Sequence, residues 1–180
     1  MMASQVSAAG LPRRLLSEAV ARGGLVQVAR GLYALPDTWE DPFYVTQSRF
    51  ARGTFSDGTA LFLHGMTDRV PFQLTMTFPR GYNKTRAKEA GVVCRSCADD
   101  VLELGLCEVR TSFGNVVRAY NVERTLCDLV RGQRVVDDQV VTPAMRTYVR
   151  SANCDPVRLM DYARALGVEG KIRTYLRVLL

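Results

Sequence analysis

The chain has 180 residues, of which 47% are apolar and 23% are charged, as in an ordinary globular protein. This composition excludes a disordered or fibrous chain, and the length predicts one or two small domains. The apolar runs are about half as long as a membrane span, and no secretory signal pattern follows Met1. We therefore expect a cytoplasmic protein.

The net charge of +6 is concentrated at the two ends of the chain. Residues 1–36 hold four Arg and one Glu, residues 37–142 hold 13 basic and 14 acidic side chains, and residues 143–180 hold seven basic and three acidic ones. Only three of the 24 basic residues are Lys. Arginine suits contacts with phosphate and guanine, although a GC-rich genome would explain the same bias.

The N-terminal segment predicts a helix, a basic helix and a hairpin in that order. Gly10-Leu11-Pro12 separates a short helix over 3–9 from a helix over 13–22, and strands over 25–28 and 32–35 are joined by a turn ending in Gly31. This order is typical of a winged helix-turn-helix, in which the second helix enters the major groove of DNA. The predicted DNA-binding residues are Arg13, Arg14, Ser17, Arg22, Gln27 and Arg30. The alternative is a small helical cap whose arginines are only solvated.

From Asp37 onward the chain predicts a mixture of helices and strands, which indicates an α+β fold ending in helices. Asp37-Thr38, Ser56, Asn121 and Asp155 are expected to cap helices. Helices are predicted over 40–50, 58–66, 84–90, 99–104, 122–130, 138–150, 156–166 and 168–179, and strands over 72–78, 92–95, 106–111 and 116–120.

No motif in the sequence predicts catalysis. His64 is the one histidine, and its place at the end of an apolar helix favours a capping or hydrogen-bonded role over acid–base work. Phosphate-binding glycine loops are absent, and Glu123, Arg124 and Asp128 are expected to pair along their helix as structural electrostatics. We expect no enzymatic activity.

The five cysteines are expected to be free thiols, because the number is odd and the compartment is reducing. Cys94 and Cys97 form a CxxC pair that could supply half of a zinc site. A closed zinc site needs four ligands, which this pair does not complete. We therefore expect no metal and no cofactor.

Two further basic stretches could contact phosphate or an acidic protein surface. Arg80, Tyr82, Lys84 and Arg86 follow a predicted strand, and Arg158, Arg164, Lys171, Arg173 and Arg177 lie around the apolar stripe of the last helices. The alternative is that both stretches are ordinary solvated surface.

Several stretches taken together resemble the AbiEi-like antitoxins of type IV toxin–antitoxin systems. They are GLVQVARGLYALPD, EDPFYVTQSRFARGTFSDGTALFLHGMTDRVPFQLTMTFPRGYN, FGNVVRAYNVERTLCDLVR and LMDYARALGVEGKIRTYLRVLL. The resemblance covers residues 3–180 and implies a winged-helix domain over 1–36, which represses its own operon by binding inverted repeats. It also implies an antitoxin domain over 37–180, which opposes a nucleotidyltransferase-like toxin.

The chain departs from the family pattern at two places. In the family a helix usually precedes the stretch that corresponds to Ala3–Val6, so the winged domain is expected to lack its first helix. The CxxC pair is not a feature of the family, and the resemblance assigns no catalytic role to His64 or Asp128. Two alternative functions are an enzyme that modifies the toxin, for example by phosphorylation, and a direct protein–protein inhibitor that uses the basic C-terminal helices or the loop from Pro79 to Arg86.

Overall fold

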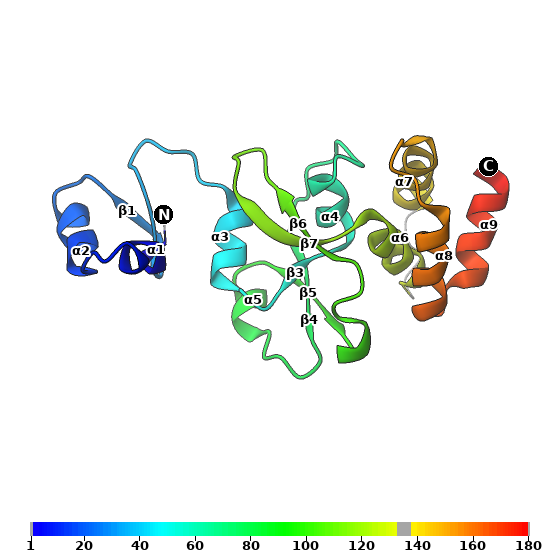
Figure 1. The fold of residues 1–180 in the computed structure, drawn as a ribbon, viewed down its shortest axis with the longest axis horizontal. Helices are drawn as coiled ribbons and strands as arrows, with labels where there is room; N and C mark the ends of the chain where they lie inside the picture. The colour runs from blue at the N-terminus through cyan, green and yellow to red at the C-terminus, as the bar shows by residue number, and fades with distance from the viewer. Residues whose placement is uncertain (1, 133–137, 180) are drawn as a thin grey trace. The chain divides into compact units, whose positions relative to one another are not determined.

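The computed structural model describes residues 2–132 and 138–179, and contacts between them define two units (Figure 1). The first unit comprises Met1–Ala51 together with Thr111–Asn115, and the second comprises Arg52–Arg110 and Val116–Leu180. The chain combines helices with a mixed sheet, so the predicted α+β class is confirmed. The predicted division after Pro36 stays a prediction.

The first unit begins with the predicted order of helix, helix and hairpin. Its elements are α1 (Ala3–Ala8), α2 (Arg14–Ala21), β1 (Val26–Ala29), β2 (Leu32–Ala34) and α3 (Pro42–Arg49). Strands β1 and β2 pair antiparallel, and Gly31 in their turn has φ +76°, a conformation that glycine adopts without strain. The buried apolar side chains of this unit include Val6, Leu16, Leu32, Phe43 and Phe50.

Helix α3 is capped by Asp41, and the expectation that Asp37-Thr38 caps it is wrong. Asp41 Oδ1 accepts hydrogen bonds from the backbone N–H groups of Phe43 and Tyr44, at 3.0 and 3.2 Å. Its Oδ2 accepts from Thr111 Oγ1 at 2.6 Å and from Asn115 Nδ2 at 2.9 Å. The buried Asp41 carboxylate therefore joins the start of α3 to Thr111–Asn115 within the first unit.

A five-stranded mixed sheet forms the centre of the second unit, in the order β5-β4-β3-β7-β6. The strands are β3 (Thr54–Phe55), β4 (Thr75–Pro79), β5 (Val93–Cys97), β6 (Leu106–Arg110) and β7 (Val116–Tyr120). The pairs β4–β5 and β3–β7 are parallel, whereas β3–β4 and β6–β7 are antiparallel.

The sheet differs from the sequence prediction in two strands. Strand β3 was not predicted, because two residues carry no measurable alternation. Strand β4 begins at Thr75, and the prediction that it begins at Phe72 is wrong, since the Phe72 side chain is 101% exposed. Apolar alternation before Thr75 therefore does not correspond to a buried sheet face.

Three short elements and four longer helices complete the second unit. They are α4 (Asp57–Leu63), α5 (Thr85–Glu89), η1 (Asp99–Val101), α6 (Val122–Arg131), α7 (Asp138–Arg150), α8 (Pro156–Ala165) and α9 (Glu169–Leu179). Asn121 and Asp155 cap α6 and α8 as predicted, by accepting from the N–H groups of Arg124 and Arg158.

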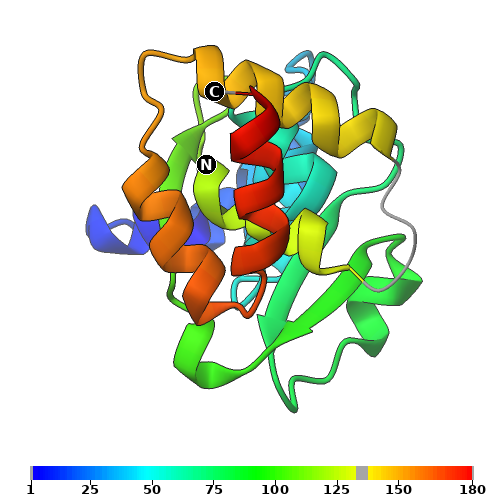
Figure 2. The ribbon, with the colours of Figure 1, turned by 90° about the vertical axis from the view of Figure 1, so that its right-hand side faces the viewer.

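Helix α6 is the central member of the helical layer. It contacts α4, α7, α8 and α9, and α9 lies beside α7 and α8 (Figure 2). The core between these helices includes Leu61, Leu126, Met145, Leu159 and Ile172, each 0% exposed. This packing fixes the position of α6 and therefore also positions the charged side chains on another face of this helix.

None of the helices in residues 2–132 and 138–179 has both the length and the apolar character needed to cross a membrane.

Candidate functional site

The first candidate site is the surface of α1, α2 and the β1–β2 hairpin. All the residues that the sequence predicts as DNA-binding are exposed in the first unit: Arg13, Arg14, Ser17, Arg22, Gln27 and Arg30. Their assignment to DNA stays a prediction.

Helix α2 has one buried face and one charged face. Leu16 is only 4% exposed and anchors the helix in the first unit. Arg14 and Glu18 are four residues apart, so they share the face opposite Leu16. Arg13 instead donates from Nε to Ser7 Oγ of α1 at 3.0 Å, so its guanidinium group links the two helices.

The hairpin is held against α1 by backbone contacts. Ala3 N–H donates to the carbonyl of Gly31 at 2.8 Å, and Met2 forms a bridge with Leu32. Arg30 stands at the exposed turn, next to Gly31. Helix α2 and the hairpin tip thus both present arginine side chains to solvent.

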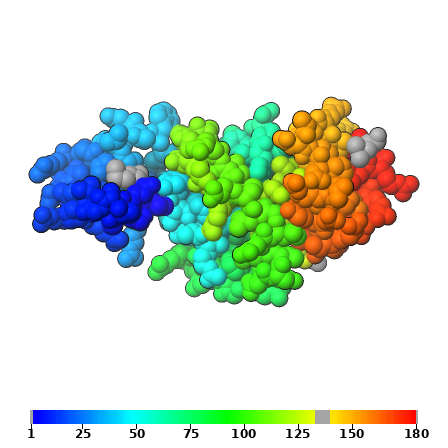
Figure 3. Space-filling model, in the orientation of Figure 1, coloured from blue at the N-terminus to red at the C-terminus, as the bar shows by residue number. Residues whose placement is uncertain are grey.

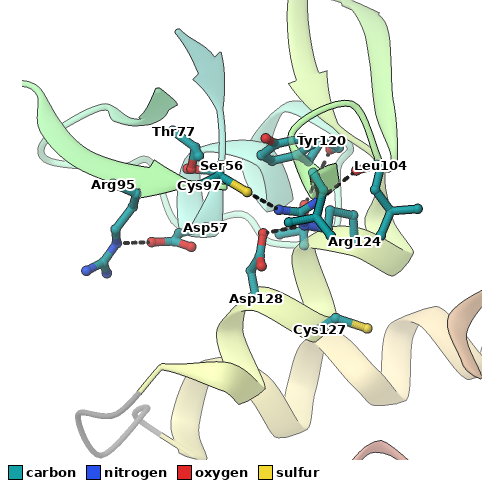
Figure 4. Close-up of polar contacts among 12 residues, drawn as sticks. Ser56, Asp57, Thr77, Arg95, Cys97, Leu104, Tyr120, Arg124, Cys127 and Asp128 are labelled. Carbon is teal, nitrogen blue, oxygen red and sulfur yellow. Dashed lines mark hydrogen bonds and ion pairs between the residues drawn. The ribbon is translucent and has the colours of Figure 1, made fainter. Parts of the chain in front are cut away.

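The second candidate site is a cavity of about 260 Å³ in the second unit, between the β4–β5 part of the sheet and α6 (Figure 4). On the sheet, Thr77 pairs with Arg95, and Arg95 and Cys97 lie two residues apart on one face. On α6, the spacing of Arg124, Asp128 and Arg131 places all three on one side of the helix. We call this the arginine cavity, and its charged lining residues are Asp57, Arg80, Arg95, Arg124, Asp128 and Arg131.

Arg124 is buried at one wall of the arginine cavity and is held by several partners. Its side chain is 1% exposed, and Nε donates to Asp128 Oδ2 at 2.8 Å. The Nη1 nitrogen donates to the carbonyls of Val101 and Leu104 at 2.5 and 2.9 Å, and Nη2 donates to Cys97 Sγ at 3.3 Å. The guanidinium group also lies over the Tyr120 ring, 4.3 Å from its centroid.

Asp57 provides the second carboxylate of the arginine cavity. It accepts from Arg95 Nε at 2.9 Å, although the two residues are 38 positions apart in sequence. Its φ of +50° lies in the left-handed region, which for a residue other than glycine costs of order 1–3 kcal/mol and often marks functional positions. Burial raises the pKa of the other carboxyl, Asp128, while Arg124 opposes that rise.

The remaining charged residues of the arginine cavity have guanidinium nitrogens that are not used in pairing. Arg95 uses only Nε for Asp57, and its side chain is 60% exposed. Within the described part of the chain, the exposed side chains of Arg80 and Arg131 form no ion pair and no hydrogen bond. The cavity therefore holds four arginines against two carboxylates.

His64 has the hydrogen-bonded role that the sequence predicted. It is the C-terminal cap residue of α4, and its Nε2 donates to the Tyr120 carbonyl at 2.9 Å. Burial lowers the pKa of His64 from its usual 6.5, so the neutral ring is favoured.

The CxxC pair gives no closed ligand set. Cys94 and Cys97 lie on β5, three residues apart and so on opposite faces, and all five cysteines are free. Among the residues that the structure describes, no three His, Cys, Asp or Glu side chains gather where they could hold one metal ion.

The predicted surface at residues 80–86 separates into different environments. Arg80 lines the arginine cavity, while Tyr82 stacks on Phe78 with ring centroids 4.8 Å apart. Lys84 donates to Ser96 Oγ, and Arg86 lies exposed on α5. A shared partner surface for these four residues stays a prediction.

The basic residues of α8 and α9 are largely paired with nearby acids. In the space-filling view these two helices form one continuous surface (Figure 3). Arg158 pairs with Glu123 and Asp155, Arg164 with Asp161 and Glu169, and Arg173 with Glu169. Lys171 donates to the Val130 carbonyl, and Arg177 is exposed. The pairing reduces the local excess of positive charge, and a role in binding a partner stays a prediction.

The sequence patterns did not predict the arginine cavity as a site. The spacing of Arg124, Asp128 and Arg131 was visible, but it is also the spacing of ordinary helix-surface ion pairs. Asp57 and Arg95 come together only when the sheet and α4 fold, so no local sequence pattern predicts that both line the cavity.

The first unit contains a helix, a helix and a hairpin in that order, and helix-turn-helix proteins use such elements to contact DNA. The family model described as "Transcriptional regulator, AbiEi antitoxin" matches residues 3–36. This range contains α1, α2, β1 and β2. The family relationship is therefore found for this N-terminal segment.

Comparison with solved structures shows the same fold in another protein. The crystal structure of the RV2827C protein from Mycobacterium tuberculosis matches with a TM-score of 0.56 and 17% sequence identity. The match covers 89% of this chain, and the chain spans 63% of that protein's chain. No curated protein matches this sequence.

Proposed function

We propose that this protein is a DNA-binding antitoxin that represses its own operon. Residues 1–36 would contact inverted repeats in the promoter, and residues 37–180 would counteract a nucleotidyltransferase-like toxin. The observation that carries the proposal is the family match to residues 3–36, which coincides with the exposed helix–helix–hairpin surface.

The geometry of this surface favours DNA over other polyanions. Arg14 on α2 and Arg30 at the hairpin turn project from two elements, as a major-groove helix and a wing require. Glu18 shares the face of Arg14, and a carboxylate in the major groove can accept a hydrogen bond from cytosine. A face that mixes both charges can read bases, whereas phosphate contacts alone need only positive charge.

The direct test measures, by fluorescence anisotropy at several salt concentrations, how tightly the full chain binds the upstream region of its operon. Wild type is expected to prefer this duplex to a scrambled one of equal length. The double variant Arg14→Ala/Arg30→Ala should bind at least about tenfold more weakly, with a salt slope reduced by about 2, because two phosphate or base contacts are lost.

The matched control is Arg146→Ala/Arg150→Ala, which removes the same charge from exposed positions of α7 in the second unit, outside the predicted basic surfaces. This control should keep the affinity of wild type within about twofold. Equal weakening by both double variants would mean that binding depends only on net charge, and the proposed interface would then be wrong.

The antitoxin activity is tested by co-expression with the neighbouring toxin gene. Rescue of growth together with co-elution of the two proteins would support direct inhibition. Rescue without co-elution would support antagonism at the toxin's target, and a phosphate added to the toxin would support the enzymatic alternative. Failure to rescue growth would remove the antitoxin half of the proposal.

A further inference from the structure

The arginine cavity contains more arginines than its two carboxylates can neutralise. Its two carboxylates are each paired with an arginine, Asp128 with Arg124 and Asp57 with Arg95. Arg80 and Arg131 remain without an ion pair among the described residues and line the same cavity. Four guanidinium groups around one hollow repel each other, and a bound anion would offset that repulsion.

The charge and the donor type of the cavity lining suit phosphate. Arg95 offers the terminal nitrogens of its guanidinium fork, because only Nε is committed to Asp57. A fork of parallel N–H donors fits two oxygens of one phosphate. The surplus of two positive charges is close in size to the charge of a phosphate monoester, which is about −1.5 to −2 at neutral pH.

The cavity also lies at the carboxyl ends of two parallel strands of the sheet. Strands β4 and β5 are parallel, and they end together at Pro79 and Cys97. Arg80 and Ala98, which immediately follow these two ends, line the cavity. The carboxyl ends of parallel strands are the usual edge for ligand binding in such sheets.

The wall formed by Arg124 is rigid. Its guanidinium group is fixed by one carboxylate, two carbonyl oxygens and one sulfur, so it contributes positive potential without needing to move. A rigid wall lowers the entropy cost of binding, because fewer side chains must be ordered by the ligand.

We propose that the arginine cavity binds the phosphate monoester of a small molecule, with Arg80, Arg95 and Arg131 holding the phosphate. A volume of about 260 Å³ is close to the lower limit of small-molecule pockets, which suits one phosphate and a compact organic group. This site lies in the second unit and is separate from the proposed DNA-binding residues.

The test is calorimetric titration of the full chain with adenosine 5′-monophosphate, O-phosphoserine and inorganic phosphate, with adenosine as the uncharged comparison. At least one of the two phosphate monoesters should bind saturably with one site and more tightly than inorganic phosphate, and adenosine should not bind. Comparison of the two esters shows whether a nucleoside or an amino acid group is preferred. Absence of saturable binding of both esters would overturn the proposal, as would binding of inorganic phosphate as tight as that of the esters, or equal binding of adenosine.

The variants separate the cavity from general charge effects. Arg131→Gln breaks no ion pair described in the structure, so it should fold normally and weaken phosphate binding at least about tenfold. Arg95→Gln should do the same, although it also leaves Asp57 unpaired. Arg150→Gln removes an equal charge from an exposed position of α7, outside the cavity and outside the predicted basic surfaces, and should bind as wild type does. Equal loss in Arg131→Gln and Arg150→Gln, or no loss in Arg131→Gln, would contradict the proposal.

Discussion

At the scale of single residues, Arg124 was predicted to form an ion pair along its helix, and the structure shows that this ion pair is buried. The sequence predicted that it pairs with Asp128, and this pair is confirmed at 2.8 Å. The burial of Arg124 to 1% exposure could not be predicted, because the neighbours that bury it come from residues 97–104 and 120. Ion pairs on helix surfaces and buried ones share the same spacing in sequence.

Replacing Arg124 by Met is expected to lower the free energy of unfolding by about 3–5 kcal/mol, because the Asp128 carboxylate would lose its hydrogen-bonded partner in a largely buried position. Urea denaturation followed by circular dichroism measures this loss. Arg164→Met is the control, since Arg164 and Asp161 are 58% and 59% exposed and such a pair contributes less than about 1 kcal/mol. Similar losses in the two variants would show that burial does not strengthen the role of Arg124.

His64 predicts a dependence of stability on pH. Its pKa in the folded protein lies below 6.5, mainly because burial disfavours the charged ring. Below pH 6.5 the unfolded chain therefore binds a proton that the folded protein does not, and stability falls as the pH decreases toward the folded pKa.

The measurement is the urea midpoint of wild type and His64→Gln between pH 8 and 5, a range chosen around the usual pKa of about 6.5 for histidine. The glutamine amide can still donate to the Tyr120 carbonyl, but it does not titrate. The midpoint of the variant should fall less steeply below pH 6.5 than that of wild type. Parallel curves would show that His64 is not the group responsible.

At the scale of elements, the capping residues illustrate what local sequence decides. Asn121 and Asp155 cap their helices as predicted, because a cap depends on a few adjacent residues. Asp41 was not recognised as the cap of α3, since Asp37-Thr38 precedes the same apolar stretch and is equally suitable in sequence. Its contacts with Thr111 and Asn115, about seventy positions away, decide the choice.

The loop before β6 packs closely against the start of α6, and Gly105 is the residue that permits this. Its φ is +75°, and a Cβ at this position would lie 2.6 Å from Arg124 Cβ and 2.7 Å from Asn121 Oδ1. Gly105→Ala is therefore expected to destabilise the protein by more than about 2 kcal/mol, from backbone strain and overpacking together. Thermal unfolding measures the effect.

Gly114→Ala is the matched control for this substitution. Gly114 has φ +85° but no atom within 4 Å of an added Cβ, so only the backbone strain of about 1 kcal/mol applies. Should both alanine variants lose the same stability, the close packing of Gly105 against α6 would not be the cause.

At the scale of the whole molecule, the division of charge along the chain corresponds to different situations in the two units. The N-terminal arginines predicted to bind DNA are exposed in the first unit. Of the seven basic residues in 143–180, Arg158, Arg164 and Arg173 are paired with Asp155, Asp161 and Glu169. Net charge from sequence therefore identifies the ends of the chain, but it does not distinguish available charge from neutralised charge.

The two proposed sites are expected to be separable in the intact chain, because their residues belong to different units. Arg14→Ala/Arg30→Ala should lose DNA affinity at least about tenfold and keep phosphate-compound binding, whereas Arg131→Gln should show the reverse. Anisotropy and calorimetry on the same preparations measure both properties. Loss of both activities in either variant would indicate a single polyanion surface.

The sequence by itself determined the α+β class, the helix–helix–hairpin order of the first unit and most helix ends. These features depend on glycine and proline positions, capping side chains and apolar periodicity within about ten residues. Only the tertiary structure decided the two-residue strand β3, the parallel pairing of β4 with β5 and the arginine cavity. These depend on contacts between distant segments, such as Asp57 with Arg95 and Cys97 with Arg124, which leave no periodic signal in the sequence.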